Sequence, residues 1–382
     1  MDISKKVEQL APSGIRAFFD LVLGMKDVIS LGVGEPDFVT PWHIREKAVY
    51  SLEKGYTSYT SNKGMIELRR EIAGFLKRRH GLDYDPEEEI LITVGVSEGL
   101  DLAMRAILNP GDKVLIPQPA YVSYGPVVDL AGGKPVFLET NLKSGFKVSA
   151  EDIKKAYTKG VKAVLLGYPA NPTGASYKKS ELLEISRVAL KHDLIVVSDE
   201  IYDELTYDFE HTPVSSLPGM KKNTIYLNGF SKSYAMTGFR IGYACGPQKF
   251  ISAMTKIHQY TILCAPITSQ MAALEAIKSG FKDVGEMKRE YVRRRRFVVE
   301  RLNEMGLDCH NPDGAFYVFP SIKKTKRSSL DFAKDLLKKK KVALVPGVAF
   351  GKTCEDYVRI SYASSYENLK EAMLRIESYL AR

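Results

Sequence analysis

The sequence has few cysteines and no long apolar run. Its four cysteines, at positions 245, 264, 309 and 354, lie far apart and form no CxxC pair, so we expect neither a metal centre nor a disulfide framework. Free thiols are typical of a reducing compartment, and we predict a cytoplasmic location. No apolar stretch approaches the roughly 20 residues that span a bilayer, and the N-terminal segment lacks a signal-peptide core. We therefore expect no membrane partner.

The chain does have the size and composition of a globular protein with more than one domain. Its 382 residues are 45% hydrophobic and 26% charged, and roughly 100 to 200 residues per domain predicts two or three domains. The net charge is +9, and the excess lies largely in the runs 77–79, 293–296 and 338–341. Run 293–296 falls in a helical pattern, and we interpret it as a solvated helix face. No nucleic-acid-binding motif accompanies these charges, so we expect no nucleic-acid partner.

Between residues 89 and 245, short apolar runs alternate with longer helical patterns. The expected strands are 90–94, 113–117, 135–139, 161–167, 194–198, 224–228 and 240–244, and helical periodicity follows residues 94, 117 and 177. This alternation predicts an α/β fold whose mainly parallel seven-stranded sheet is covered on both faces. In such sheets the ligand binds at the carboxyl ends of the strands, so residues just after these runs are candidates for a site.

The pattern changes after about residue 285. A long basic helix is followed by short strands at 315–320, 342–346 and 357–363, by a helix that ends near residue 340, and by a final helix. We interpret this part as a smaller α+β domain that the N-terminal segment joins. The predicted divisions are 1–40 for the N-terminal arm with part of the small domain, 41–285 for the large domain, and 286–382 for the small C-terminal domain.

Five polar features follow the predicted strands of the large domain. They are Asp199, Lys232, Arg240, Asn171 in an NPTG sequence, and the GVSEG turn at 95–99. The turn begins a helix, whose N-terminal N–H groups attract anions. Each feature alone has an ordinary structural explanation, such as a turn or a helix cap. Their joint position at one edge of the sheet indicates a site.

These features belong to motifs that resemble the class I/II aminotransferases of fold type I, the aspartate and aromatic aminotransferase-like enzymes that depend on pyridoxal 5′-phosphate (PLP). The motifs are SLGVGEPDF (30–38), YTSNKGMIELR (59–69), PAYVSY (119–124), YPANPTG (168–174), SDEIYDELTYD (198–208), SKSYAMTGFRIGY (231–243), GAFYVFP (314–320) and VRISYA (358–363). They extend over nearly the whole chain, and the resemblance implies that the large domain binds PLP. The set is specific for the family but not for a substrate.

The resemblance implies a role for each strand-end residue. Lys232 would bind the cofactor covalently and then move a proton, which near neutral pH requires a lowered pKa. Asp199 would keep the pyridine nitrogen protonated, so that the ring acts as an electron sink. Asn171 and Tyr202 would donate hydrogen bonds to the 3′-oxygen of the ring.

The same resemblance implies the other contacts of cofactor and substrate. The implied phosphate ligands are Ser231, Arg240, the backbone of Val96 and Ser97, and Tyr59 of the neighbouring subunit. Tyr121 would stack on the cofactor ring, where the family commonly has Trp, and Gly229 stands where some members have a phosphate-binding Ser. Arg359 would hold the substrate α-carboxylate with its guanidinium fork, beside Asn171 and the backbone of Gly34.

The sequence leaves the amino donor open. Ile15 and Phe18 near the N-terminus and His258 and Tyr260 in segment 256–266 favour an aromatic or other hydrophobic donor, with 2-oxoglutarate as acceptor, but they fit lid packing equally well. Lys63 is a candidate for binding the distal carboxylate of a dicarboxylate substrate. Family members with such sequences also accept aspartate, alanine or a diaminopimelate derivative.

We therefore expect an amino-acid aminotransferase that works by a ping-pong cycle in amino acid biosynthesis. Because Tyr59 is expected to act across subunits, the resemblance also implies a homodimer with shared active sites. Two alternatives stay open. One is another PLP reaction on the same scaffold, such as a C–S β-lyase or a synthase, and the other is a regulator without turnover, for which the +9 charge is the best support.

Overall fold

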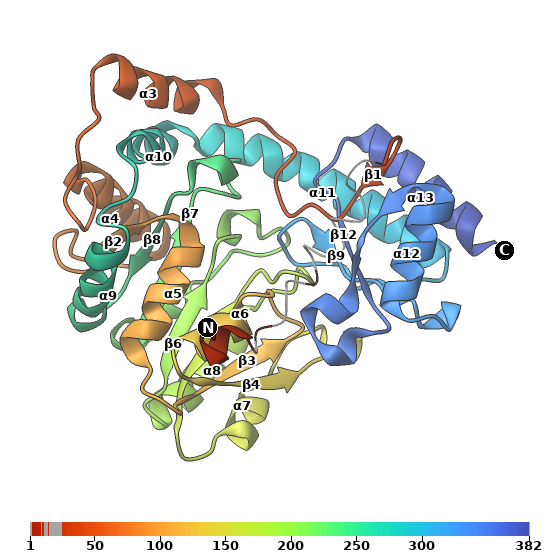
Figure 1. Cartoon of the computed structure of the whole chain (residues 1–382), viewed down its shortest axis with the longest axis horizontal. Coiled ribbons are helices and arrows are strands. Elements are labelled where there is room, and N and C mark those ends of the chain that lie inside the picture. Colours follow the sequence, from red (N-terminus) through yellow and green to blue (C-terminus); the bar gives the residue numbers. More distant parts are fainter. Residues whose placement is uncertain (1, 9, 11–13, 15–24, 382) are drawn as a thin grey trace.

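The computed structural model, which describes residues 2–8, 10, 14 and 25–381, contains a seven-stranded sheet between helices (Figure 1). The strands are β2 (Ile90–Thr93), β3 (Lys113–Gln118), β4 (Lys134–Glu139), β5 (Val161–Gly167), β6 (Ile195–Asp199), β7 (Thr224–Gly229) and β8 (Gly242–Cys245). Their order is β2-β8-β7-β6-β5-β3-β4. β8 runs antiparallel to both neighbours, and the other pairs are parallel. The predicted α/β fold with a mainly parallel sheet is confirmed.

The first residues of β8 depart from the prediction. The expected strand 240–244 begins only at Gly242, because Arg240 has a φ of 51°, in the left-handed region. Since β8 runs opposite to β7, the start of β8 lies at the edge where β7 ends. Arg240 therefore reaches the edge that carries the ends of the parallel strands.

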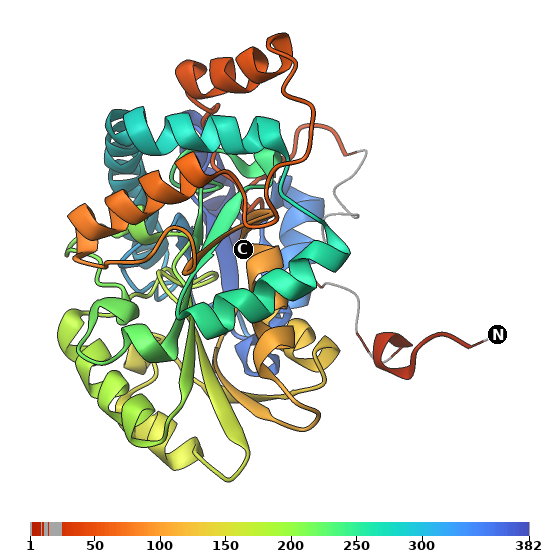
Figure 2. The ribbon, with the colours of Figure 1, turned by 90° about the vertical axis from the view of Figure 1, so that its left-hand side faces the viewer.

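Helices cover both faces of the sheet, as the rotated view shows (Figure 2). One face packs against α5 (Gly95–Ile107), α6 (Tyr124–Leu130) and α9 (Gln248–Thr261). The other packs against α4 (Ile66–His80), α7 (Ala150–Ala156), α8 (Lys179–Lys191) and α10 (Ile267–Ser279), and α3 (Trp42–Glu53) lies on α10. Neighbouring strand residues alternate between these clusters, so Leu165 joins the first and Leu166 the second. Burial on both faces explains the continuous apolar runs.

A second group of elements surrounds a smaller sheet. It contains α11 (Phe281–Glu304), α12 (Ser329–Lys340), α13 (Tyr366–Leu380) and the antiparallel strands β9 (Tyr317–Val318), β11 (Val345–Pro346) and β12 (Val358–Ser361). β1 (Ile29–Ser30) pairs with β10 (Val342–Ala343), and α1 (Lys5–Glu8) precedes them. One apolar cluster joins Leu31 to side chains between Met287 and Tyr379. The same cluster also contains Tyr202 and Leu205, and the division of the chain at residues 40 and 285 stays a prediction.

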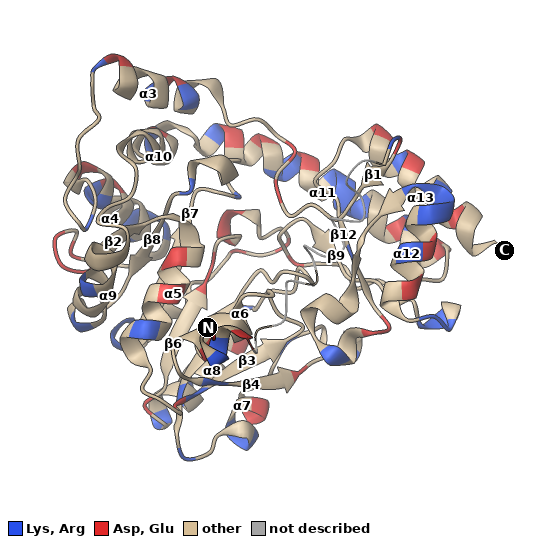
Figure 3. Cartoon of the chain, viewed as in Figure 1, with Lys and Arg blue, Asp and Glu red and all other residues tan. Residues whose placement is uncertain are grey.

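Only half of the arginine run in α11 is the solvated face that its pattern suggested, because Arg293 and Arg296 are exposed but the two arginines between them are buried. Arg294 and Arg295 are each only 6% exposed. Arg294 pairs with Asp37 at 2.8 Å, and Arg295 pairs with Asp208 at 2.7 Å. Acidic residues also lie beside the basic ones along this helix (Figure 3). A buried guanidinium needs such partners, and here they come from loops far away in the sequence.

The structure also describes the state of the cysteines and the apolar character of the helices. All four cysteines are free thiols, and Cys245 and Cys354 are buried. Among the described residues, no helix combines the length and the apolar character that a membrane crossing requires.

Candidate active site

A cavity of about 1460 Å³ opens at the carboxyl ends of the strands. Its wall contains nearly all the site residues predicted from the sequence: Gly34, Val96, Ser97, Tyr121, Asn171, Asp199, Tyr202, Ser231, Lys232, Arg240 and Arg359. Tyr59 is not on this wall, and its side chain is 82% exposed. A single chain therefore brings together every predicted site residue except Tyr59.

Lys232 follows β7, and its amine reaches the cavity. Nζ donates a 2.7 Å hydrogen bond to the backbone oxygen of Gly34. Burial lowers the pKa of Lys232 to about 8, although the nearby charge of Glu35 acts in the opposite direction. A lysine with this pKa is partly unprotonated near neutral pH, so it can act as a nucleophile and exchange protons.

Asp199 is the last residue of β6, and its buried carboxylate faces the same cavity. Oδ2 accepts a 2.8 Å hydrogen bond from the hydroxyl of Tyr124, and Oδ1 accepts a longer one, 3.4 Å, from the backbone N–H of Ile201. Burial raises the pKa of Asp199 to about 6 in spite of these donors. A carboxylate has about four acceptor positions, so Asp199 keeps capacity for a cationic N–H group in the cavity.

Arg359, on β12, presents a buried guanidinium to the cavity. Nη1 donates a 2.9 Å hydrogen bond to Oδ1 of Asn171, and Nη2 donates to the backbone oxygen of Gly32. Nε is buried and has no partner among the described residues. A guanidinium with a spare donor suits a carboxylate ligand. Because Asn171 uses its oxygen on Arg359, its NH₂ group is left for an acceptor in the cavity.

The N-terminus of α5 and Arg240 form an anion-binding corner. The N-cap of this helix is Val94, whose side chain makes no capping hydrogen bond and whose N–H donates to the Glu98 carboxylate at 2.5 Å. Gly95 has a φ of 73°, and a Cβ added there would lie 2.7 Å from Nη2 of Arg240, so only glycine lets the guanidinium come this close. Val96 and Ser97 follow in the first turn. The helix dipole and the guanidinium together favour a dianion such as a phosphate group.

Two tyrosines of this wall were missed by the sequence analysis. Tyr124 donates to Asp199, and the hydroxyl of Tyr317 lies 2.9 Å from that of Tyr202. Both have mostly apolar neighbours in the sequence, in PAYVSY and GAFYVFP. A tyrosine in such a segment is usually interpreted as part of the hydrophobic core. Membership of those motifs was the only available signal.

The residues considered for substrate choice are not on the described wall. Lys63 pairs with Glu88 at 2.9 Å, and buried His258 bonds to Glu98 at 2.7 Å. The side chain of Tyr260 is 87% exposed. Two further candidates, Ile15 and Phe18, lie outside the described residues.

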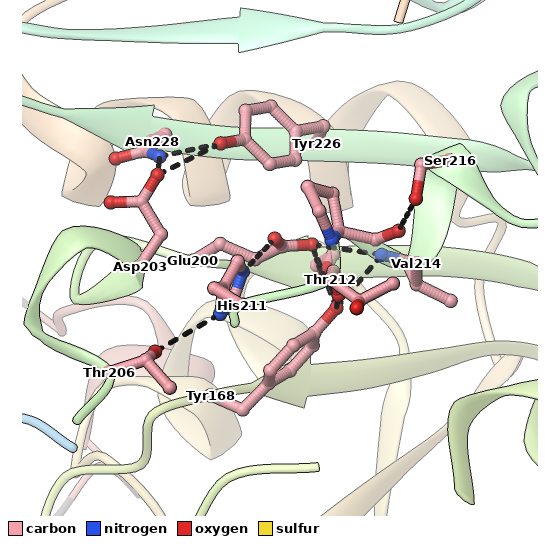
Figure 4. A network of polar contacts seen from close by, with 12 residues as sticks. Tyr168, Glu200, Asp203, Thr206, His211, Thr212, Val214, Ser216, Tyr226 and Asn228 are labelled. Atoms are coloured by element: carbon pink, nitrogen blue, oxygen red, sulfur yellow. Dashed lines mark hydrogen bonds and ion pairs between the residues drawn. The ribbon is translucent and has the colours of Figure 1, made fainter. Parts of the chain in front are cut away.

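The residue after Asp199 belongs to a separate, closed network (Figure 4). Glu200 is fully buried, and its Oε1 accepts hydrogen bonds from Ser198 at 2.6 Å and Tyr168 at 3.0 Å. Oε2 lies 2.6 Å from Nε2 of His211. Burial alone would lower the pKa of His211, but the hydrogen bond and the charge of Glu200 outweigh it, and the pKa is raised. None of these four residues lines the cavity, so the network has a structural role.

A possible metal cluster lies beside this network. His80, Asp203 and Glu204 each offer one ligand atom within 4.8 Å of the others. Both carboxylates already have partners, because Asn228 donates to Asp203 at 2.7 Å and Arg79 pairs with Glu204 at 3.5 Å. We assign no metal to this cluster.

Comparisons with known proteins identify the family to which the chain is similar. A sequence model of the family described as "Aminotransferase class I and II" matches residues 26–376. The chain is 48% identical to an aspartate aminotransferase of Pyrococcus abyssi, over 100% of this chain and 98% of that protein. It is 45% identical to aromatic-amino-acid aminotransferase 2 of Thermococcus litoralis, with the same coverage. The solved structure of an aromatic aminotransferase from Pyrococcus horikoshii matches with a TM-score of 0.91 and 46% identity, over 96% of this chain and 98% of that one.

Proposed function

The chain belongs to the class I and II aminotransferases, and we propose that it transfers the amino group of aspartate or an aromatic L-amino acid to 2-oxoglutarate, with PLP as cofactor. Family membership makes it an amino-acid aminotransferase. The observation that carries the proposal is that Lys232, Asp199 and Arg359 open on one cavity. An amine, a carboxylate and a guanidinium are the groups that this reaction needs.

The residues of the cavity fit PLP in charge and in shape. The N-terminus of α5 and Arg240 suit its phosphate, with Ser231, Val96 and Ser97 as further ligands. Among the described residues, Asp199 accepts hydrogen bonds from Tyr124 and Ile201 but forms no ion pair, and the protonated ring nitrogen would supply a cationic partner. The free NH₂ group of Asn171 and the hydroxyl of Tyr202 suit the ring's 3′-oxygen, and Tyr121 suits the ring face.

When bound, PLP supplies an electron sink for the negative charge that forms on Cα of the amino acid. Lys232 would hold the cofactor, and its amine would take a proton from Cα of the amino acid and give a proton back. Its pKa of about 8 makes both directions accessible near neutral pH. Asp199 would keep a proton on the ring nitrogen, and that positive charge would in turn lower the pKa of Asp199.

Arg359 binds and orients the substrate through its α-carboxylate. The guanidinium matches that group with two parallel hydrogen bonds, while Gly34 leaves the space beside it free of a side chain. For the donor side chain, the aromatic rings of Tyr121 and Phe137 line the same cavity, and so does Lys352. The aromatic rings favour an aromatic amino donor, and the lysine favours a dicarboxylate donor such as aspartate. The proposal therefore includes both classes of donor.

We also propose a homodimer in which Tyr59 completes the partner's phosphate site. Tyr59 and Tyr260 are largely exposed, as are Trp42 and Ile262. The loop that carries Tyr59 meets the segment that follows α9, where Asn62 donates to the backbone oxygen of Leu263 at 2.8 Å. Exposed apolar side chains gathered in this way mark an association surface. Sedimentation of the wild type as a dimer, and loss of cofactor affinity in Tyr59→Phe, are the expected results.

The cell compartment and the pathway are the last parts of the proposal. The four free thiols support a cytoplasmic location. Reversible amino transfer makes an amino acid from its 2-oxo acid, which supports a role in amino acid biosynthesis. Cell fractionation tests the first, and growth of a deletion strain on single amino acids tests the second.

Absorption spectra of the holoenzyme with single amino acids, and with no keto acid present, test the main proposal. A donor that gives up its amino group bleaches the visible band of the bound cofactor, and we expect this with aspartate, tyrosine or phenylalanine. Lys232→Ala is the control that should not respond. Release of ammonia in step with keto acid would contradict transamination and favour a lyase. Absence of a visible band after PLP is added would contradict the cofactor assignment.

A further inference from the structure

Tyr317, the first residue of β9, touches two groups of the active site at once. It is fully buried. Its hydroxyl oxygen lies 2.9 Å from the hydroxyl oxygen of Tyr202. The guanidinium carbon of Arg359 stands 4.5 Å from the centre of its ring. Tyr202 and Arg359 belong to distant parts of the chain, so Tyr317 links the proposed ring-oxygen donor to the proposed carboxylate ligand.

The hydroxyl of Tyr317 is held in one place by its surroundings. A Cβ added to Gly34 would lie 3.0 Å from this oxygen, so the glycine leaves just enough room for it. Phe316 packs against the ring at a centroid distance of 4.7 Å, and Tyr202 packs edge-on at 5.9 Å. Close packing on several sides fixes the rotamer, so the hydroxyl stays within reach of Tyr202.

We propose that Tyr317 is a positioning residue with two separable parts: its hydroxyl strengthens the hydrogen bond that Tyr202 donates to the cofactor, and its ring holds the guanidinium of Arg359 in place for the substrate carboxylate. The proposal rests on the proposed function, because it needs PLP at the site. Tyr317 acts through its neighbours and does not replace either of them.

The hydroxyl part follows from the number of protons available. When Tyr202 donates its proton to the ring oxygen, it has none left for Tyr317, so Tyr317 must be the donor in their shared hydrogen bond. Donation to the oxygen of Tyr202 polarises its O–H bond and makes it a stronger donor, since such chains are cooperative. A stronger donor stabilises negative charge on the ring oxygen. When the cofactor-bound site loses its titrating proton, the negative charge on the ring oxygen is less shielded. The hydroxyl of Tyr317 therefore stabilises the deprotonated form of the site.

The ring part follows from the position of the guanidinium. The faces of Tyr317 and Phe350 lie 4.5 Å and 5.1 Å from the guanidinium carbon of Arg359. The negative face of an aromatic ring attracts a cation, and more so away from water. No carboxylate pairs with this arginine among the described residues. The two rings therefore hold the charge while leaving its carboxylate-binding edge free.

Other charged and titratable groups face this pair from the surrounding elements. They are Lys232 after β7, Asp199 at the end of β6, Tyr121 before α6, and Glu35 beside Gly34. All of them stay in place when only the hydroxyl of Tyr317 is removed. A change caused by that deletion is therefore assigned to the hydroxyl.

The first test is a pH titration of the visible band of the holoenzyme in Tyr317→Phe. The ring stays and the hydroxyl is lost, so we expect the transition to move to higher pH by roughly 0.3 to 1 unit, the equivalent of one net hydrogen bond. Tyr362→Phe is the matched control. It also removes a buried hydroxyl, one that donates to the backbone oxygen of Ala315 at 3.1 Å, but Tyr362 does not line the cavity. Its band should titrate as in the wild type.

The second test removes the ring. Tyr317→Leu should weaken binding of a non-reactive carboxylate, maleate or 3-phenylpropionate, by roughly 3- to 30-fold. Tyr317→Phe should keep the wild-type affinity within about twofold, since its ring remains over Arg359. The probe is whichever of the two acids perturbs the band of the wild type, and melting curves show that each variant is folded.

The outcomes separate this proposal from the proposed function. A wild-type protein that shows no visible band with PLP overturns both. A wild type with a titrating band, together with an unshifted band in Tyr317→Phe, overturns the hydroxyl part alone. Equal carboxylate affinity in Tyr317→Leu and the wild type overturns the ring part. A shift of the same size in Tyr362→Phe would show a general effect of buried hydroxyl loss and would also overturn the proposal.

Discussion

Asp199 and Glu200 are consecutive carboxylates at the end of one strand, yet their surroundings differ. Asp199 faces the cavity and accepts one good hydrogen bond, from Tyr124, and one long one. Glu200 faces away and contacts Tyr168 and His211 (Figure 4). It also accepts a hydrogen bond from Ser198. The alternation of strand side chains sends the two acids to opposite sides. Asp199 is left with few hydrogen-bond donors beside the cavity, whereas the protein itself supplies the hydrogen-bond partners of Glu200.

This difference separates a ligand-binding group from a structural one. A buried carboxylate without enough donors is costly, and the raised pKa of Asp199, about 6, expresses that cost. A cation in the cavity would remove it. Glu200 already has a hydrogen-bonded partner in His211, whose pKa it raises. We therefore expect changes on the cavity side to alter turnover and changes in the closed network to alter stability.

The largest effect is expected on the cavity side, from Lys232→Ala. Loss of the amine removes both the covalent ligand of the cofactor and the group that moves the proton, so turnover should fall by roughly 10⁴-fold or more. Steady-state assays with saturating PLP measure it. Lys222→Ala, at an exposed lysine away from this cavity, should keep wild-type activity. Turnover in Lys232→Ala within tenfold of the wild type would rule out the assigned role.

On the other side of the comparison, Glu200→Ala should act on stability. It leaves His211 and two hydroxyl groups buried without their acceptor, so the free energy of unfolding should drop by about 3 to 5 kcal/mol. Urea unfolding measures this. The matched control is Glu184→Ala, which breaks the exposed ion pair with Arg187 and should cost under about 1 kcal/mol. Equal losses in the two variants would contradict the structural role of Glu200.

Asp199→Asn should stabilise the cofactor-free protein, whereas Glu200→Ala should destabilise it. The pKa of Asp199 is raised from 3.8 to about 6, so the folded chain keeps a proton between these pH values that the unfolded chain has released. Stability therefore falls as pH rises through this window, and the loss is complete above it. The asparagine variant should be more stable than the wild type at pH 8, by on the order of 3 kcal/mol, and equally stable at pH 4. Urea unfolding at both pH values checks it, and a destabilised variant at pH 8 would refute the strain on Asp199.

The smallest effect is expected from the titration of His211. Its pKa is raised above 6.5 in the folded protein, so its contribution is fully present below pH 6.5 and is lost as pH rises through the raised value. The stability difference between the wild type and His211→Gln should then be larger at pH 5.5 than at pH 9. Unfolding curves at a series of pH values measure it. A difference that grows with pH would show that His211 is buried neutral.

Much of the fold and of the cavity wall could be predicted from the sequence. The runs that became β5, β6 and β7 are apolar because helices cover both faces of the sheet, and the chemistry-bearing residues follow them directly. Arg240 and the start of β8 were placed less well, since a positive φ at a non-glycine residue leaves no sequence signal. The expected strand 342–346 is two strands, β10 and β11, which pair with different neighbours.

What the sequence could not show is contact between distant residues. Tyr124 lies 75 residues from Asp199 and Tyr317 lies 115 residues from Tyr202, so their roles depend on the folded arrangement. The same holds for buried Arg294, which pairs with a residue 257 positions away. Periodicity places a side chain on a face of a helix or strand, but it does not identify the partner across the interface.

The most direct test of the comparison is to measure turnover and unfolding free energy for Asp199→Asn and Glu200→Gln side by side. Both variants replace a buried carboxylate by the amide of the same shape. We predict that Asp199→Asn loses roughly 10² to 10³-fold in turnover, as expected when an electrostatic group at the reacting centre is removed, and that Glu200→Gln keeps turnover but unfolds more easily. Near-normal turnover in Asp199→Asn, or a larger loss of turnover in Glu200→Gln, would contradict the account.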